Sequence, residues 1–214
     1  MIFFDLEFYV PKNDRISTHS LIVNPNLKTH KLLGGTFYSK CFDEKIPNTP
    51  KFNQLWLWNY ENDEKQLLRE IYELFQQEWK KTKKEEKWIL GKPIVDLVVC
   101  GIGISWFDIP ALYCRSVRFQ IDSPEQLYNV YFKTRNIDLA NVCSFVFPDE
   151  KCIYPKTAKE IMGRMDIKKE KSSSKNVWEL FDNDDTDKIE KRTTEEIETI
   201  LQMYRNIQKK ISKG

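Results

Sequence analysis

The sequence lacks several features that would assign it to a familiar class of protein. No apolar run approaches the ~20 residues that a membrane-spanning helix needs, and no cleavable secretory signal opens the chain. The five cysteines are an odd number, widely spaced, and form no C-x-x-C pair, which argues against a disulfide framework or a zinc ribbon. We therefore expect a soluble, cytoplasmic protein with reduced thiols and no membrane partner.

An excess of charge of one sign is also nearly absent. Lys and Arg total 34 and Asp and Glu total 32, which leaves a formal net charge of +2. The net charge of the chain therefore gives no indication of a nucleic-acid partner. The charges are segregated along the chain instead, with basic blocks at 80–92 and 156–175 and an acidic block at 179–198. We interpret the first basic block as the solvated end of a helix.

The sequence does contain enough apolar residues for a core, in alternating strand and helix patterns. Hydrophobic residues make up 41% of the 214 residues, which suits one domain spanning 1–214. Strand-like patterns occupy 2–10, 17–25, 93–104 and, as a short strand or buried segment, 137–147. Helical patterns occupy 63–80, 123–134 and the last third of the chain, where the final helix is predicted from about Thr193 to Ile211. This order predicts an α/β fold with a mixed β-sheet flanked by helices and a helical C-terminal third.

Two carboxylates inside the first strand, "FFDLEFY", need an explanation. Asp5 and Glu7 are two residues apart and so point to the same face of the strand. Burying two like charges side by side is costly unless a positive charge compensates them. Asp108 follows the strand pattern at 93–104, where α/β sheets place ligand sites. If these strands are neighbours, three carboxylates converge, and two Mg²⁺ or Mn²⁺ ions would neutralise them and suit phosphodiester hydrolysis.

Each of these motifs also has a simpler explanation. In the first, one carboxylate of the pair lies at an exposed strand end. In the second, Asp108 is the N-cap of a helix that has Pro110 just inside its first turn. Their occurrence together favours the metal site.

The two motifs resemble those of the DEDD (DnaQ-like) 3′–5′ exonucleases. "FFDLEFY" is similar to the first motif of that superfamily, a D-x-E on the first strand. "GIGISWFDIPALYCRS" is similar to its second motif, G-x-N-x-x-x-F-D-x-P-x-L-x-x-R. Within the superfamily, this motif most resembles that of the DNA-polymerase-B-like exonuclease branch. The resemblance covers the chain from residue 1 to about residue 205. It implies a ribonuclease-H-like fold, two Mg²⁺ or Mn²⁺ ions, and release of nucleoside monophosphates from 3′ ends of single-stranded DNA or RNA.

The resemblance also implies roles for individual residues. The expected metal-binding and catalytic residues are Asp5, Glu7, Asp108 and Glu196. The residues expected to contact the substrate are Leu6, Phe8, Phe107 and Arg115. For Arg115, an ion pair with a nearby carboxylate is the alternative.

The third motif departs from the pattern of the superfamily, which has Y-x-x-x-D or H-x-x-x-x-D. The best register places Glu196 at the Asp position, Arg192 at the Tyr position and Lys191 at the His position. Neither basic residue is a typical general base, and the chain's two histidines, His19 and His30, lie far away in sequence. The asparagine of the second motif is also replaced, by Gly103, so any contact of that asparagine side chain with a substrate is lost.

Glu196 has competing interpretations. With Thr193 as N-cap, it would complete a capping box at the start of the last helix. Glu195 replaces it if the register shifts by one residue. Other candidates for a fourth ligand lie in the acidic run, which we otherwise interpret as a solvated loop: Asp182, Asp184, Asp185 and Asp187.

The sequence therefore predicts a metal-dependent 3′–5′ exonuclease. The main alternative is a catalytically weakened or inactive member of the superfamily that binds nucleic acid or a partner protein, which the degenerate third motif favours. A hydrolase of small nucleotides is a further possibility.

Overall fold

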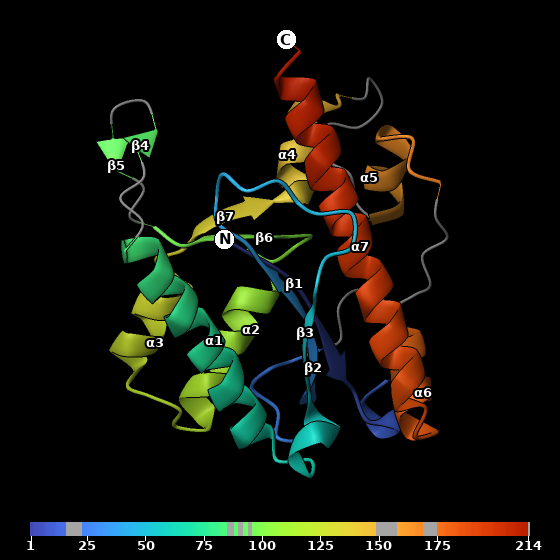
Figure 1. Ribbon diagram of the computed structural model, residues 1–214. Coiled ribbons are helices and arrows are strands. Elements are labelled where there is room, and N and C mark those ends of the chain that lie inside the picture. Colours follow the sequence, from blue (N-terminus) through green and yellow to red (C-terminus); the bar gives the residue numbers. More distant parts are fainter. Residues whose placement is uncertain are drawn as a thin grey trace.

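A mixed five-stranded sheet forms the centre of the protein (Figure 1). The computed structural model describes residues 1–15, 23–84, 88–89, 92–93, 96–148, 158–168 and 175–213. The sheet has the order β3-β2-β1-β6-β7, with β1 (Ile2–Tyr9), β2 (Lys31–Ser39), β3 (Asn53–Trp56), β6 (Val98–Gly101) and β7 (Arg135–Asp138). Strands β1, β2 and β3 pair antiparallel, whereas β6 pairs parallel with both β1 and β7. The predicted α/β class and mixed sheet are confirmed; most of the strand predicted at 17–25 lies outside the described residues.

Helices cover both faces of this sheet (Figure 1). One group consists of α1 (Glu64–Lys84), α2 (Asp108–Arg118) and α3 (Pro124–Tyr131). The other consists of α4 (Leu139–Val146), α5 (Ala158–Arg164), α6 (Lys175–Asp182) and α7 (Thr186–Ile211). Short 3₁₀ turns at Lys12–Asp14 and Leu57–Tyr60 and a small ribbon of β4 (Trp88–Ile89) and β5 (Lys92–Pro93) complete the described elements. Among the described residues, no helix combines the length and apolar character that crossing a membrane requires.

The two faces of β1 belong to different environments. Phe4, Leu6 and Phe8 alternate along the strand and join the core beneath α1 and α2. Phe3 points the other way and packs in a second core with residues of α4, α5 and α7. Asp5 and Glu7 share the face of Phe3 by the same alternation, so the carboxylates of β1 lie on the side of the sheet that α7 covers.

The carboxylate-bearing half of β1 extends past its parallel neighbour. The ladder between β1 and β6 consists of Ile2 with Val99 and Phe3 with Cys100, so it ends before Asp5. The antiparallel partner β2 places Gly35 opposite Leu6, and a Cβ atom at Gly35 would lie 2.3 Å from the carbonyl oxygen of Asp5. The missing side chain therefore allows β2 to approach closely beside Asp5.

Two predicted elements differ from the structure. The last helix begins at Thr186, seven residues before the predicted start at Thr193. The segment 137–147, predicted as a short strand or buried segment, contains the end of β7 followed by helix α4. Its helix begins there because the Asp138 carboxylate accepts a hydrogen bond from the backbone N–H of Ala140 and acts as N-cap.

Arg115 joins α2 to α1 and to the chain before β2. It is 1% exposed and donates to both carboxylate oxygens of Glu64, over 2.7 and 2.5 Å. Its remaining terminal nitrogen donates to the carbonyl oxygens of Pro25 and Leu27. The prediction that Arg115 contacts substrate is therefore corrected to its alternative, a buried ion pair with a neighbouring carboxylate.

We predict that Glu64→Gln destabilises the protein by about 3–5 kcal/mol, because it leaves the buried Arg115 charge without its partner. Urea unfolding measures the loss. Glu73→Gln is the matched control, since Glu73 is an exposed residue of the same helix. Equal stability of the two variants would show that the pair contributes nothing.

Candidate metal centre

Three of the four predicted metal ligands meet between β1 and α7. Asp5 and Glu7 come from β1 and Glu196 from α7, and one carboxylate oxygen of each lies within 4.8 Å of the others. Glu7 is buried, whereas Asp5 and Glu196 are partly exposed. In Figure 1, α7 runs along the face of the sheet that contains this group. The structure therefore brings together residues that are about 190 positions apart.

Arg192 places a positive charge beside these carboxylates. Its two terminal nitrogens donate to Glu7 Oε1 and, over 3.0 Å, to Glu196 Oε1. Burial lowers the pKa of the Arg192 guanidinium, but the negative charges of Glu7, Glu196 and Asp5 outweigh burial and raise that pKa above its ordinary value. Arg192 therefore stays protonated and compensates part of the charge on β1.

The hydroxyl of Thr193 also holds Glu7. It lies 3.3 Å from Glu7 Oε1 and 2.9 Å from the carbonyl oxygen of Ile189, one turn earlier in α7. Thr193 is thus an interior residue of the helix and not its N-cap, so the capping-box interpretation of Glu196 is wrong. Glu195 is exposed and is not a member of the carboxylate group.

The acidic run before α7 stabilises the turn between α6 and α7. Asp182 accepts hydrogen bonds from the Tyr9 hydroxyl, over 2.7 Å, and from Arg15, over 2.8 Å. Asp185 occupies the N-cap position of α7, and Asp184 and Asp187 are exposed. None of these four residues belongs to the carboxylate group found among the described residues.

Asp108, the fourth predicted ligand, begins α2 and is not a member of the group. It is 6% exposed, and the N-cap position belongs to Phe107, so Asp108 is not the cap either. The ring of Phe107 packs edge-on against Phe8, with centroids 5.0 Å apart. The start of α2 therefore lies against the half of β1 that contains Glu7.

The apolar residues predicted to contact substrate are core residues in the structure. Leu6 and Phe8 are 7% and 5% exposed and pack in the core beneath α1 and α2. Phe107 is partly buried and packs against the same core. Leu6 and Phe8 thus lie on the face of β1 opposite the carboxylates and hold the strand in the core. A contact of these three residues with substrate stays a prediction.

Sequence reasoning missed two residues near Asp108. Asp138 is 3% exposed and accepts hydrogen bonds from the backbone N–H groups of Gly103, over 3.0 Å, and Ser105, over 3.3 Å. It thereby ties the loop before α2 to the start of α4, and its place just before a helix was the available signal. Trp106, in the same loop, is 82% exposed; its exposure had no signal in the sequence.

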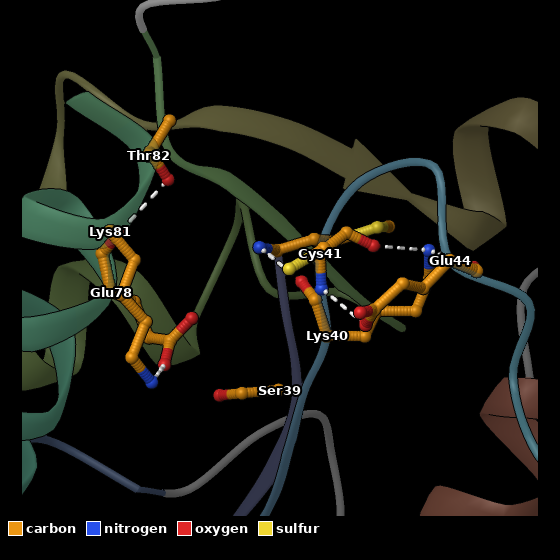
Figure 2. A pocket seen from close by; sticks show the side chains of 8 residues that line it. Ser39, Lys40, Cys41, Glu44, Glu78, Lys81 and Thr82 are labelled. Atoms are coloured by element: carbon orange, nitrogen blue, oxygen red, sulfur yellow. Dashed lines mark hydrogen bonds and ion pairs between the residues drawn. The ribbon is translucent and has the colours of Figure 1, made fainter. Parts of the chain in front are cut away.

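A separate pocket lies at the opposite end of β1 (Figure 2). Ser39, Lys40, Glu78 and Lys81 contribute to its lining. The Lys40 ammonium donates to three backbone carbonyls that follow it in the chain, and Lys81 pairs with Glu78 over 2.5 Å. The charged groups of this pocket are thus engaged with the protein itself, and none of the predicted site residues lines it.

We predict that Asp182 makes stability depend on acid pH. Burial raises the pKa of this carboxyl, but hydrogen bonds from Arg15 and Tyr9 and the charges of Arg15 and Lys12 outweigh it, so the pKa lies below its ordinary value. A carboxyl with a lowered native pKa stabilises the fold at neutral pH, and this stabilisation is lost as the pH falls through that pKa, below about 4.

Urea unfolding at a series of pH values measures this effect. Asp182→Asn should lose less stability on acidification than the wild type, because the titrating group has been removed. Asp184→Asn, at an exposed neighbour, should keep the wild-type dependence. The same slope in all three proteins would contradict the role of Asp182.

Comparisons with known proteins give no relative for this chain. No family model, curated protein or solved structure matches it significantly. The resemblance of its motifs to those of the DEDD exonucleases therefore stays a prediction from the sequence.

Proposed function

We propose that this protein is a metal-dependent 3′–5′ exonuclease that acts on single-stranded DNA or RNA. The observation that carries the proposal is the meeting of Asp5, Glu7 and Glu196. These residues occupy the ligand positions of the first and third exonuclease motifs, and nothing local in the sequence brings them together. The mixed sheet, in which β1 lies between an antiparallel and a parallel neighbour, supports a ribonuclease-H-like fold.

The carboxylate group is suited in size and chemistry to a hard divalent cation. Mg²⁺ binds oxygen ligands at about 2.0–2.1 Å, so oxygens on opposite sides of one ion lie about 4.2 Å apart. The three carboxylate oxygens lie within 4.8 Å of one another. Small rotations of the side chains would bring them to the spacing that the ion requires. Asp5, Glu7 and Glu196 would hold Mg²⁺ or Mn²⁺, with Asp108 approaching from the start of α2.

Bound Mg²⁺ or Mn²⁺, with two ions in the predicted mechanism, would activate a water as nucleophile and polarise a phosphoryl oxygen. The protein contributes the positioning. The apolar side chains of β1 hold the strand in the core, and Thr193 and Arg192 fix the Glu7 carboxylate. Trp106 offers an exposed aromatic face two residues before Asp108, on which a terminal base can stack.

One observation favours a second candidate function. Arg192 stands at the Tyr position of the third motif and Lys191 at its His position, where the superfamily has the residue that orients water. The raised pKa of Arg192 leaves it unable to accept a proton. This favours a catalytically weakened or inactive protein that binds nucleic acid or a partner without cleaving it. The intact carboxylate pair on β1 favours the enzyme.

The proposal predicts a metal-dependent ladder of products from 3′ ends. Single-stranded DNA and RNA labelled at the 5′ end should shorten stepwise with Mn²⁺ or Mg²⁺, and substrate labelled at the 3′ end should release a labelled mononucleotide. EDTA should abolish both results. Asp5→Asn and Glu196→Gln should lower the rate by roughly 100-fold or more, because each removes a ligand of the activating cation.

Glu195→Gln is the matched control, since it removes an exposed carboxylate beside Glu196. It should retain the wild-type rate. Cleavage of no substrate with any metal would overturn the exonuclease, and fluorescence anisotropy with the same labelled strands would then test the second candidate. Binding that Asp5→Asn leaves unchanged would support a protein that binds without cutting.

A further inference from the structure

The loop between β6 and α2 presents an indole ring to the solvent. Trp106 is 82% exposed, which is the highest value among the exposed large apolar side chains of the described residues. Other tryptophans contribute to the core: Trp56 and Trp178 are buried in it, and Trp58 and Trp79 pack against it. The ring of Trp106 therefore has both the area and the access that a ligand needs.

The backbone beneath this ring is held in one conformation. The buried Asp138 carboxylate accepts hydrogen bonds from the N–H groups of Gly103 and Ser105. Within the loop, the N–H groups of Trp106 and Phe107 donate to the carbonyl oxygen of Gly103, over 3.0 and 3.1 Å. A ligand that stacks on Trp106 would thus have to order the side chain but not the loop, which lowers the entropic cost of binding.

The exposed ring lies at the edge of the sheet that carries the carboxylates. Strands β1, β6 and β7 are parallel, so their carboxyl ends meet at one edge, where α/β sheets bind ligands. The loop leaves β6 after Gly101, and α2 begins with Asp108, two residues after Trp106. The ring of Phe107 packs against Phe8, with centroids 5.0 Å apart. Trp106 is therefore presented beside the half of β1 that contains Glu7.

The same loop has open space at Gly103. This residue has a φ of +75°, and a Cβ atom at its position would meet no atom within 4 Å. The second motif of the superfamily has its asparagine there, so this chain has no side chain at that position with which to bind a ligand. An indole three residues later offers a different kind of contact, a flat apolar surface that stacks on the face of any base.

We propose that Trp106 stacks on the unpaired base of the 3′-terminal nucleotide, so that the protein selects ends whose last base is free and accepts any base there. The inference deepens the proposed function and rests on it for the class of ligand. A base-paired end is disfavoured, because its terminal base must first leave the duplex stack. The contact engages the base and not the phosphate, so it requires no metal ion.

A thermodynamic cycle between Trp106 and the terminal base tests this inference. Two single strands of DNA labelled at the 5′ end are compared, one intact and one with an abasic 3′-terminal nucleotide, by fluorescence anisotropy in EDTA at low salt. The wild type should bind the abasic strand roughly tenfold more weakly, because one stacked base is lost. Trp106→Ala should bind both strands equally weakly. Trp106→Phe keeps an aromatic ring and should retain most of the preference, which also keeps the test valid if the alanine variant is unstable.

Tyr128→Ala is the matched control. It removes another exposed aromatic side chain, 50% exposed and located in α3, and it should keep the preference of the wild type. A strand whose abasic nucleotide is at the 5′ end should bind the wild type as tightly as the intact strand does. Equal weakening by abasic nucleotides at either end would overturn the assignment of the ring to the 3′ terminus.

The possible outcomes separate this inference from the proposed function. Equal affinity of the wild type for the two strands, an undiminished preference in Trp106→Ala, or binding of neither strand would overturn the role of Trp106. So would a wild-type dimer that Trp106→Ala converts to a monomer in analytical ultracentrifugation, because a second copy of the chain would then cover the ring. The expected cycle without cleavage in Mn²⁺ or Mg²⁺ would support the role of Trp106 and overturn the exonuclease. Metal-dependent cleavage without the cycle would do the reverse.

Discussion

The contact of Arg192 with Glu7 and Glu196 is the interaction on which the carboxylate face of β1 depends. A central strand with two acidic residues on one side is unfavourable in a packed sheet, because carboxylates lose their hydration there. Helix α7 packs apolar residues against Phe3. It also places the Arg192 guanidinium and the Thr193 hydroxyl against the Glu7 carboxylate. The same helix therefore contributes both apolar core residues and a counter-charge to this side of β1.

Features that arise from local chemistry were predictable from the sequence. The alternation of Phe4, Leu6 and Phe8 identified β1 and its apolar face, and the helical period identified α1. Ser123 caps α3 through the N–H of Gln126, as its position before Pro124 indicates. The sequence left open whether the first strand and the strand before Asp108 are neighbours, and the structure pairs them in parallel as β1 and β6.

Features that depend on distant contacts were not predictable. The first turns of α7 contain Ile189 as their only large apolar residue, so the periodic signal starts too late in the sequence. The apolar segment 137–147 fits a strand as well as a helix, and the cap at Asp138 decides between them. The pairing of Arg192 with Glu7 joins residues 185 positions apart, although its spacing from Glu196 was visible in the sequence.

The second motif shows that a matching residue does not establish a shared role. Asp108 begins α2 close to β1, whereas Arg115, two turns further on, is buried against Glu64 and clamps α1 to α2. The arginine of the motif thus contributes to the scaffold in this chain. Asp138 also contributes to the scaffold, because its carboxylate accepts hydrogen bonds from the backbone N–H groups of Gly103 and Ser105 in the loop before α2.

The separation of the two halves of the carboxylate group along the chain has a consequence for biosynthesis. Strand β1 leaves the ribosome first, and the residues of α7 that complete the group follow almost the whole length of the chain later. Contacts between such distant segments form slowly and late in folding. During that interval the acidic side of β1 lacks its contact with Arg192, so a nascent chain that is shortened before α7 does not form this ion pair.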